Sequence, residues 1–460
     1  MNIKLNQNKT GTILGLTLVY MIVFTLLGYG LLTLASFDKL EASRAIERSQ
    51  AFWIAEAGLE MIKTLGQQHY YEIETYMKQY DFDFGNNKCN LIISPDTTDG
   101  WDNSTNLIKK YWIKSRGKLY SASKKLLAST TLEVHAEVET FASYAYATNT
   151  EGAIWFITGD HIDGPLYTND FLHISGNPVF DGVVKSAKSS INYYNGGPPN
   201  DNPDFKQGIQ LGAPLLDISK IFDPPSRITP IINAAGPAGT KTSFIGDATI
   251  EFLSNGTMKV TNAYLNTTLG NPPGTAVTMS LPLTEAIYVN GNATVSGVVD
   301  GKVTIATENS IYLPNNVTYA YPSNPLDVFN QGFDVTTLND SLGLIARNDV
   351  VITKPYNSGD KDITIHASVL ATQPDPGHGL KGSFRAQDYA SRTLGGKINL
   401  FGGITQYERG PVGTFSGASP VTGFTKNYKY NTELLNHPPP HTPYSSFKLN
   451  QWKQGVSIHY

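Results

Sequence analysis

The chain contains a single cysteine, Cys89, among 460 residues. Without a second thiol there can be no intramolecular disulfide, so packing and hydrogen bonds must stabilise the fold. The nine histidines are scattered, and the H-E-x-x-H and C-x-x-C spacings of common zinc sites are missing. A dedicated transition-metal site is therefore unsupported, and we expect Cys89 to be a small, partly buried hydrophobic residue.

Proline is missing before Pro95, and the next proline is Pro165. Because proline disrupts helix interiors, this distribution permits a long helix near the N-terminus and favours strands and turns later in the chain. Neither sign of charge dominates, since 35 basic and 39 acidic residues give a formal net charge of −4. No basic stripe interleaves with aromatic residues, so we expect no nucleic-acid partner.

Charged side chains are also missing from residues 10–37. As a helix, the apolar residues 13–34 would span about 33 Å, close to the thickness of a bilayer's hydrocarbon core. The run is longer than a cleavable signal sequence needs, and Ser36-Phe37-Asp38-Lys39 follows it in place of a small-residue cleavage site. Lys4 and Lys9 precede it, so the positive-inside bias predicts a single-pass protein in contact with membrane lipid, with residues 1–12 cytoplasmic and the bulk extracytoplasmic.

The next residues, 38–65, favour a helix that continues from the membrane to about Leu65. Gly28 and Gly30 interrupt the apolar half, and glycine makes this the place where the helix would bend first. Beyond the membrane, apolar or small residues recur at spacings of three and four, which puts them on one face. They are Ala45, Ser49, Phe52, Ala55, Leu59, Ile62 and Leu65.

Two motifs carry a resemblance. Thr10-Gly11-Thr12 before the apolar run, and Gln50-Ala51-Phe52-Trp53-Ile54-Ala55-Glu56-Ala57-Gly58-Leu59-Glu60, resemble the N-terminus of PilX-type minor pilins and of the related tip pseudopilin of type II secretion. The resemblance implies that prepilin peptidase cuts after Gly11 and methylates Thr12, so that residues 1–11 are a leader peptide and residues 12–66 the filament helix. It also implies partners, namely other pilins or pseudopilins and the inner-membrane assembly platform.

Leu16 departs from the pilin pattern. Most pilins have a glutamate at this fifth mature position, where it pairs with the amino terminus of a neighbouring subunit. A carboxylate in a bilayer is expensive unless it is paired, and a subunit at the tip of a filament has no neighbour above it. Leu16 therefore fits a tip or priming subunit better than a major pilin, and it also fits an uncleaved signal anchor.

The remaining chain indicates an α+β to mainly β protein. Residues 67–145 predict a small pilin-like α+β head, in which Leu132, Val134, Ala136 and Val138 alternate with polar residues on a strand. A second strand around residues 111–117 is its expected partner. Residues 146–426 contain short β-rich runs separated by Asp-Gly and Asn-Gly turns, a spacing that predicts a right-handed parallel β-helix. A β-sandwich is the alternative.

Ordered motifs in this β region resemble an uncharacterised exported domain found behind PilX-type N-termini, which implies no activity. They lie at residues 158–170, 301–306, 342–350, 402–406, 409–413 and 428–430. The tail, residues 427–460, is rich in proline and tyrosine and reads as an extended strap over the end or flank of the solenoid, where it could cap a sheet edge.

Candidate chemistry is sparse. Asp160, Asp163 and Asp170 could hold calcium, or they could accept backbone hydrogen bonds in turns; otherwise we expect no cofactor. Exposed tyrosines could stack on surface glycans. Nothing in the sequence brings the arginines of the β region together with acids. We therefore predict a non-enzymatic minor pilin or pilin-like tip protein, with a membrane-anchored glycan-binding or glycan-cleaving protein as the alternative.

Overall fold

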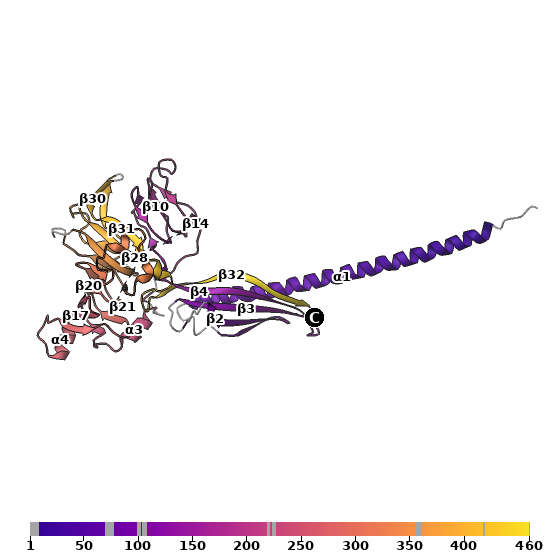
Figure 1. Ribbon diagram of the computed structural model, residues 1–460, viewed down its shortest axis with the longest axis horizontal. Helices are drawn as coiled ribbons and strands as arrows, with labels where there is room; N and C mark the ends of the chain where they lie inside the picture. Colours follow the sequence, from indigo (N-terminus) through magenta and orange to yellow (C-terminus); the bar gives the residue numbers. More distant parts are fainter. Residues whose placement is uncertain are drawn as a thin grey trace, which may run out of the picture.

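The computed structural model describes residues 9–69, 78–98, 103, 108–218, 221–222, 227–355, 361–416 and 419–459. One long helix projects from a large β-rich region with many strands (Figure 1). The sequence predicted both features, and both are confirmed.

Helix α1 (Lys9–His69) is 61 residues long and passes through Gly28 and Gly30 without a break. The outer half of α1, which contains the uncharged residues up to Phe37, stands free (Figure 1). The inner half packs on a sheet from Ala51 onward. The predicted apolar face is only partly right, because Ala45 and Ser49 are exposed and burial begins at Ala51. The helix reaches the sheet two turns later than the periodicity indicated.

The sheet beneath α1 has five antiparallel strands in the order β1-β2-β3-β4-β32. The predicted pairing is confirmed, since Ile113 of β3 lies opposite Val134 of β4. The alternating apolar residues of β4 face the helix and are buried. The bounds are β1 (Tyr80–Phe84), β2 (Asn87–Pro95), β3 (Lys109–Tyr120), β4 (Leu126–Thr140) and β32 (Tyr444–His459).

The fifth strand, β32, comes from the C-terminal end of the chain. It pairs along β4, from Tyr444 opposite Thr140 to His459 opposite Ala128. The tail was expected to lie over the solenoid and could cap a sheet edge. Its first part does contact the β region, where Thr304 donates to the Pro440 carbonyl, and β32 then adds a strand to the edge of the head. The physical reason is that β4 offers an unpaired edge of 15 residues, which a neighbouring strand satisfies with backbone hydrogen bonds.

The β region beyond the head, which we call the β body, is built on parallel pairing. Its first ladder joins ten strands side by side, each parallel to the next. In spatial order they are β15 (Ser243–Ile245), β19 (Ala286–Asn290), β21 (Lys302–Thr307), β24 (Ser341–Ala346), β26 (Ile363–Ala371), β28 (Lys397–Glu408), β5 (Tyr146–Thr150), β8 (Leu166–Thr168), β11 (Val184–Ser186) and β14 (Ile209–Leu211).

Further parallel ladders run beside the first, which is unlike the antiparallel sheets of a β-sandwich. The second joins β16 (Ala248–Leu253), β20 (Ala293–Val299), β22 (Ile311–Leu313), β25 (Val350–Ile352) and β27 (Phe384–Ala386). The third joins β20, β23 (Val317–Tyr319), β26, β28 and β31 (Thr425–Tyr430). Two short parallel sheets are β6 (Phe156–Ile157) with β9 (His173–Ser175) and β12 (Asn192–Tyr193), and β7 (His161–Ile162) with β10 (Val179–Phe180) and β13 (Asp204–Phe205).

The chain does not climb the first ladder in order. It enters in the middle at β5, proceeds to β14 at one end, and resumes at β15 at the opposite end. The connection contains α3 (Thr229–Ala235) and packs its apolar side chains on the outward face of the ladder. Leu216 is held near β8 by Asn169, whereas Ala235 lies in the same apolar cluster as Ala286 of β19. This connection therefore covers a face that would otherwise be exposed.

Smaller elements complete the β body. Strands β17 (Thr257–Asn262) and β18 (Val277–Ser280) extend β16 with antiparallel pairing, and α4 (Ala263–Leu269) lies between them. Strands β29 (Gly413–Ser416) and β30 (Ser419–Gly423) form a hairpin. The short 3-10 helices are η3 (Phe141–Ser143), η4 (Asp327–Phe329), η5 (Val335–Thr337), η6 (Pro376–His378) and η7 (Thr432–Leu435).

Candidate assembly helix and cavities

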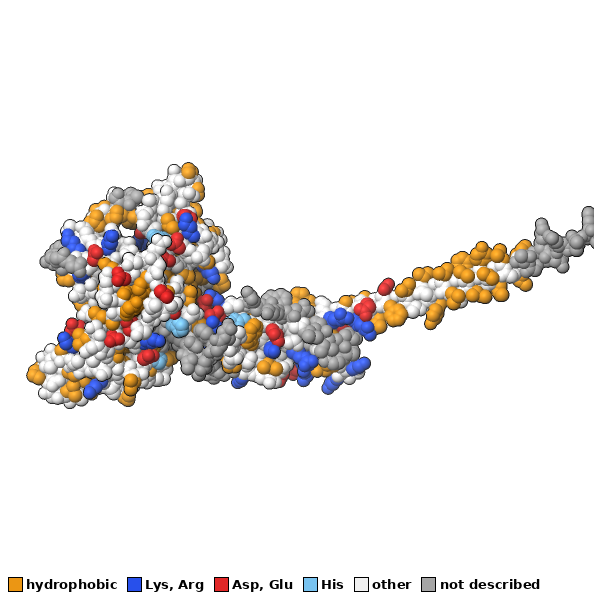
Figure 2. All heavy atoms as spheres, in the orientation of Figure 1, with side chains coloured by type: hydrophobic (Ala, Val, Ile, Leu, Met, Phe, Trp, Pro, Cys, Tyr) orange, Lys and Arg blue, Asp and Glu red, His pale blue; other side chains and the backbone are white. Residues whose placement is uncertain are grey.

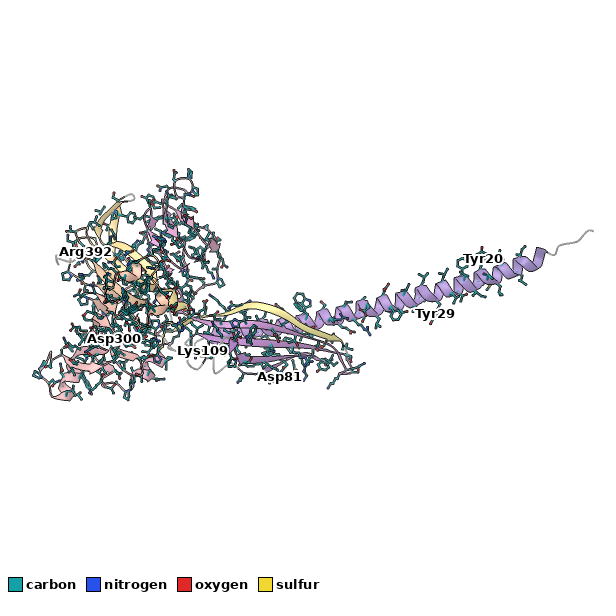
Figure 3. All side chains as sticks on the ribbon, viewed as in Figure 1. Tyr20, Tyr29, Asp81, Lys109, Asp300 and Arg392 are labelled. Carbon is teal, nitrogen blue, oxygen red and sulfur yellow. The ribbon has the colours of Figure 1, made fainter. Side chains whose placement is uncertain are left out.

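The outer half of α1 exposes large apolar side chains along its length. Leu16 is 57% exposed and Phe24 is 69% exposed, and the rings of Tyr20 and Tyr29 point away from the helix (Figure 3). The most apolar window of the helix has a mean hydropathy of 2.1 and is entirely unburied. By length and composition alone, α1 is suited to be a single-pass membrane anchor. Signal sequences share this length and composition. Figure 2 shows the apolar surface ending where charged side chains begin, before the helix meets the sheet.

The predicted residues of the outer half lie in this exposed stretch. A Cβ added at Gly28 or Gly30 would meet nothing within 4 Å, so both positions are open to a neighbouring helix or to lipid. Gly11 and Thr12 lie in the first turns of α1, but their exposure is outside the described part of the structure. Cleavage after Gly11 and methylation of Thr12 stay predictions.

The inner half of α1 approaches the sheet closely enough to require glycine on both partners. A Cβ on Gly117 of β3 would lie 2.1 Å from the backbone oxygen of Ala51, and one on Gly58 would lie 2.3 Å from the Cys89 sulfur. Ser115 donates a hydrogen bond of 2.7 Å to the Ala55 carbonyl. Burial raises the pKa of the Cys89 thiol, which disfavours the reactive thiolate.

The resemblance motif lies at this contact. Leu59 is 5% exposed and belongs to the apolar core between helix and sheet. Phe52 is half-buried and meets Trp53 edge-on at a ring separation of 5.4 Å. Glu56 is half-buried and lines a cavity beside the helix.

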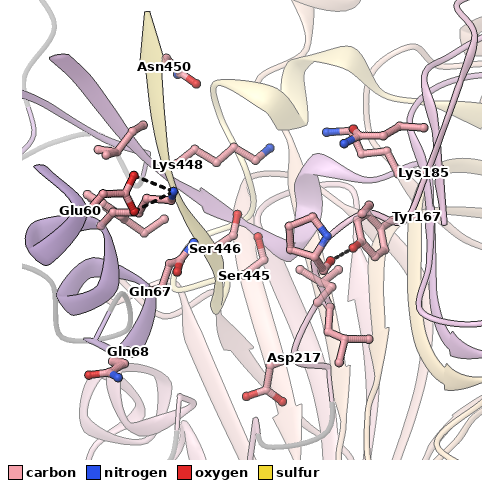
Figure 4. Close-up of a pocket in the computed structure, with 18 of the residues that line it drawn as sticks. Glu60, Gln67, Gln68, Tyr167, Lys185, Asp217, Ser445, Ser446, Lys448 and Asn450 are labelled. Carbon is pink, nitrogen blue, oxygen red and sulfur yellow. Dashed lines mark hydrogen bonds and ion pairs between the residues drawn. The ribbon is translucent and has the colours of Figure 1, made fainter. Parts of the chain in front are cut away.

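This cavity, of about 890 Å³, lies between the last turns of α1, strand β32 and the connection that follows β14 (Figure 4). Four of its charged side chains form two ion pairs, Glu60 with Lys63 at 3.1 Å and Asp217 with Arg227 at 2.6 Å. The Tyr167 hydroxyl donates to the Pro214 carbonyl. Paired charges of this kind are typical of a hydrated seam between two parts of a fold.

The three acids proposed for calcium lie near β7 and β8, and the side chains of Asp160 and Asp170 bind other groups of the protein. Asp160 receives the Lys426 ammonium at 3.2 Å, and Asp170 accepts the Glu151 and Phe171 backbone N–H groups. Burial, followed by the negative charge of Asp181, raises the pKa of Asp163. Among the described residues, no three His, Cys, Asp or Glu side chains are grouped to hold a metal ion. Calcium binding at these acids stays a prediction.

Sequence reasoning missed the ion pairs of the β body. It found no reason to join the arginines to acids, yet Arg409 pairs with Glu151 at 3.1 Å and Arg385 with Asp349 at 2.6 Å. The partners are distant in the sequence and meet only because parallel strands stack. The signal that could have indicated them is an arginine beside residues of a buried strand, where an unpaired charge would be too costly.

A protein family and a solved structure are similar to this chain. Residues 106–189 match a family described as a domain of unknown function (DUF4900), a stretch from β3 to just past β11. Comparison with curated proteins gave no match. The competence-associated pilin ComZ from Thermus thermophilus is similar with a TM-score of 0.31 and 11% identity, covering 90% of this chain and 98% of that chain.

Proposed function

We propose that this chain is a non-enzymatic, pilin-like subunit of a type IV pilus or related surface filament. The observation that carries the proposal is the division of α1, whose outer half is apolar and exposed and whose inner half is fixed on an antiparallel sheet. Such a helix can lie in the membrane before assembly and can bury the same surface against the helices of other pilins afterwards. In this proposal the inner-membrane assembly platform and prepilin peptidase act on the chain.

The β body is the part that the filament would display. We take its three ladders as the faces of one right-handed parallel β-helix, because successive strands pair in parallel and connections between parallel strands are right-handed in almost all proteins. Leu16 supports a place at the tip, where no preceding subunit has to be paired. The β body would then be presented outward for contact with surfaces.

Processing of the N-terminus tests the proposal. We expect mass spectrometry of the mature protein to find methylated Thr12 as the first residue. Gly11→Leu should abolish cleavage, whereas Gly15→Leu, four residues further along and in open space, should be cut normally. An unprocessed Met1 in the mature protein would contradict the pilin proposal and favour an uncleaved anchor.

Association with other pilins is tested separately. A photo-crosslinking residue at Leu16 or Phe24 should capture helices of other filament subunits in assembling cells, because both side chains are exposed on the outer half of α1. The same crosslinker at Leu283, which is fully exposed on the β body, should not capture them. Capture from Leu283 alone would contradict the assignment of α1 as the assembly surface.

A further inference from the structure

A second cavity, of about 450 Å³, lies where residues 153–160, which follow β5, approach the start of β31. It is bounded by residues 153–160, by residues 409–413 after β28, by the β29–β30 hairpin and by the start of β31. Two of the motifs that resemble the exported domain, residues 158–170 and 409–413, thus meet at one site. The volume falls within the range of about 300–1,000 Å³ that is typical of small-ligand pockets.

Aromatic side chains form much of its wall. Trp155 is half-buried and held in place by Tyr194 and His173, whose ring centroids lie 5.1 and 5.0 Å from that of the indole. Tyr389 is half-buried on the same cavity, and Phe424 is fixed by the Arg392 guanidinium at 4.0 Å. Trp155 and Phe424 are thus packed against neighbouring side chains without a ligand, which lowers the entropic cost of binding.

The polar groups of the cavity are few and balanced in charge. The Lys426 ammonium lies 3.2 Å from both carboxylate oxygens of Asp160, and the two side chains are 27% and 12% exposed. Arg409 also lines the cavity, but it is only 4% exposed and its charge is paired with Glu151. Beside the hydroxyls of Thr158, Thr414 and Thr425, the site therefore presents one charged acceptor and one charged donor side by side, without a net charge that would select an anion or a cation.

We propose that this cavity binds a neutral sugar unit of a glycan. The apolar C–H face of a pyranose ring would lie against Trp155 or Tyr389, and adjacent hydroxyls would donate to Asp160 and accept from Lys426. A neutral polyhydroxylated ring matches both the aromatic wall and the balanced ion pair, whereas an apolar ligand would leave that pair desolvated. This inference rests on the surface contact proposed for the β body and names its ligand. Purified protein would bind the sugar whether or not it enters a filament, so sugar binding and filament assembly can fail independently.

The test is a glycan array probed with the full-length chain in a detergent that carries no sugar headgroup, followed by titration of the best neutral oligosaccharide with tryptophan fluorescence as readout. Asp160→Asn and Lys426→Met should each weaken binding by about tenfold or more, because each removes a charged hydrogen-bond partner. The matched controls are Asp204→Asn and Lys206→Met, which alter an exposed ion pair away from the cavity and should leave the affinity unchanged.

Tyr389→Ala removes a ring from the cavity wall and should also weaken binding. This variant keeps the proposal testable if the Asp160 variant proves unstable. Absence of binding to any neutral glycan would overturn the proposal. Equal affinity of the cavity variants and the controls would do the same, as would saturation of the cavity by an indole-containing peptide that sugars fail to displace.

Discussion

The Arg409 guanidinium lies 3.1 Å from the Glu151 carboxylate, although 258 positions separate them in the sequence. Their side chains are 4% and 0% exposed. Arg409 follows β28, and Glu151 follows β5, so the pair closes the seam at which the chain's entry into the β body meets its last long strand. The guanidinium also stacks on Phe156, at 3.8 Å from the ring centroid.

Removing one member of this pair should destabilise the protein strongly. Arg409→Met leaves the Glu151 carboxylate buried without its cation, and we expect a loss of about 3–5 kcal/mol in the free energy of unfolding. Chemical denaturation of the full-length chain in detergent measures this loss. The double variant Glu151→Gln with Arg409→Met should recover part of the stability, because no buried charge is left unpaired.

The exposed pair of Lys114 and Glu133 on the head serves as the control. Its members are 2.9 Å apart and have side chains that are 52% and 37% exposed, so Lys114→Met should cost less than about 1 kcal/mol. A loss as small for Arg409→Met would show that the seam is not held by this ion pair.

Gly117→Ala tests the contact between α1 and the head. The new methyl group would overlap the backbone of Ala51 and Ala55, at 2.1 and 2.6 Å, and the helix can relieve this only by moving off the sheet. We expect a loss of about 1–3 kcal/mol in unfolding free energy. Gly28→Ala adds a methyl group on α1 that meets nothing within 4 Å, so this variant should not destabilise the head. Equal stability of the two variants would contradict the close contact.

Local sequence patterns predicted the long N-terminal helix and the strand that packs against it. The uncharged residues 10–37 and the alternation at Leu132, Val134 and Ala136 each report one element and its buried face. The position at which α1 meets the sheet was misjudged, because Ala45 and Ser49 share the periodicity of the buried residues without lying over the sheet. Periodicity gives the face of a helix, but not the point at which its partner ends.

The pairing of strands that are distant in the chain left no such pattern in the sequence. Many strands of the β body have only two or three residues, too few to show a period, and the return from β14 to β15 is set by packing on the outer face of the ladder. The cost of closing a long loop grows slowly with its length, so β32 can join β4 across the whole β body. The same reasoning applies to Glu151 and Arg409, whose meeting depends on that topology.

Charges placed in the outer half of α1 should release the protein from membranes. Phe24 and Leu27 are 69% and 57% exposed, and lysine at both positions would cost about 5–7 kcal/mol in a bilayer, at about 2.5–3.5 kcal/mol each. Carbonate extraction should find less of this variant in the membrane fraction. A double variant with lysine at Ile46 and Trp53, which are exposed beyond the uncharged stretch, should stay bound. Equal retention of both variants would mean that another segment anchors the chain.

A buried histidine couples the stability of the β body to pH. His366 lies on β26 with no exposed surface, and its ring packs edge-on against Tyr319 and Phe401 at 5.1 and 5.6 Å. Its Nδ1 accepts the Tyr319 backbone N–H at 3.2 Å, so this nitrogen carries no proton. Burial lowers the pKa of His366 to about 4, whereas an unfolded chain has a histidine pKa of about 6.5.

Between these two pKa values the unfolded chain binds a proton that the folded chain does not. The free energy of unfolding should therefore fall as the pH drops from 6.5 toward 4. Below pH 4 both states are protonated at His366, so this histidine causes no further change. The difference in pKa corresponds to a loss on the order of 3 kcal/mol. Denaturation curves across this range should be less steeply pH-dependent for His366→Gln, whose amide oxygen can still accept the Tyr319 N–H. His378→Gln, at a side chain that is 79% exposed, controls for histidine loss. If the His366 and His378 variants keep the same pH dependence as the parent chain, His366 is not the titrating group.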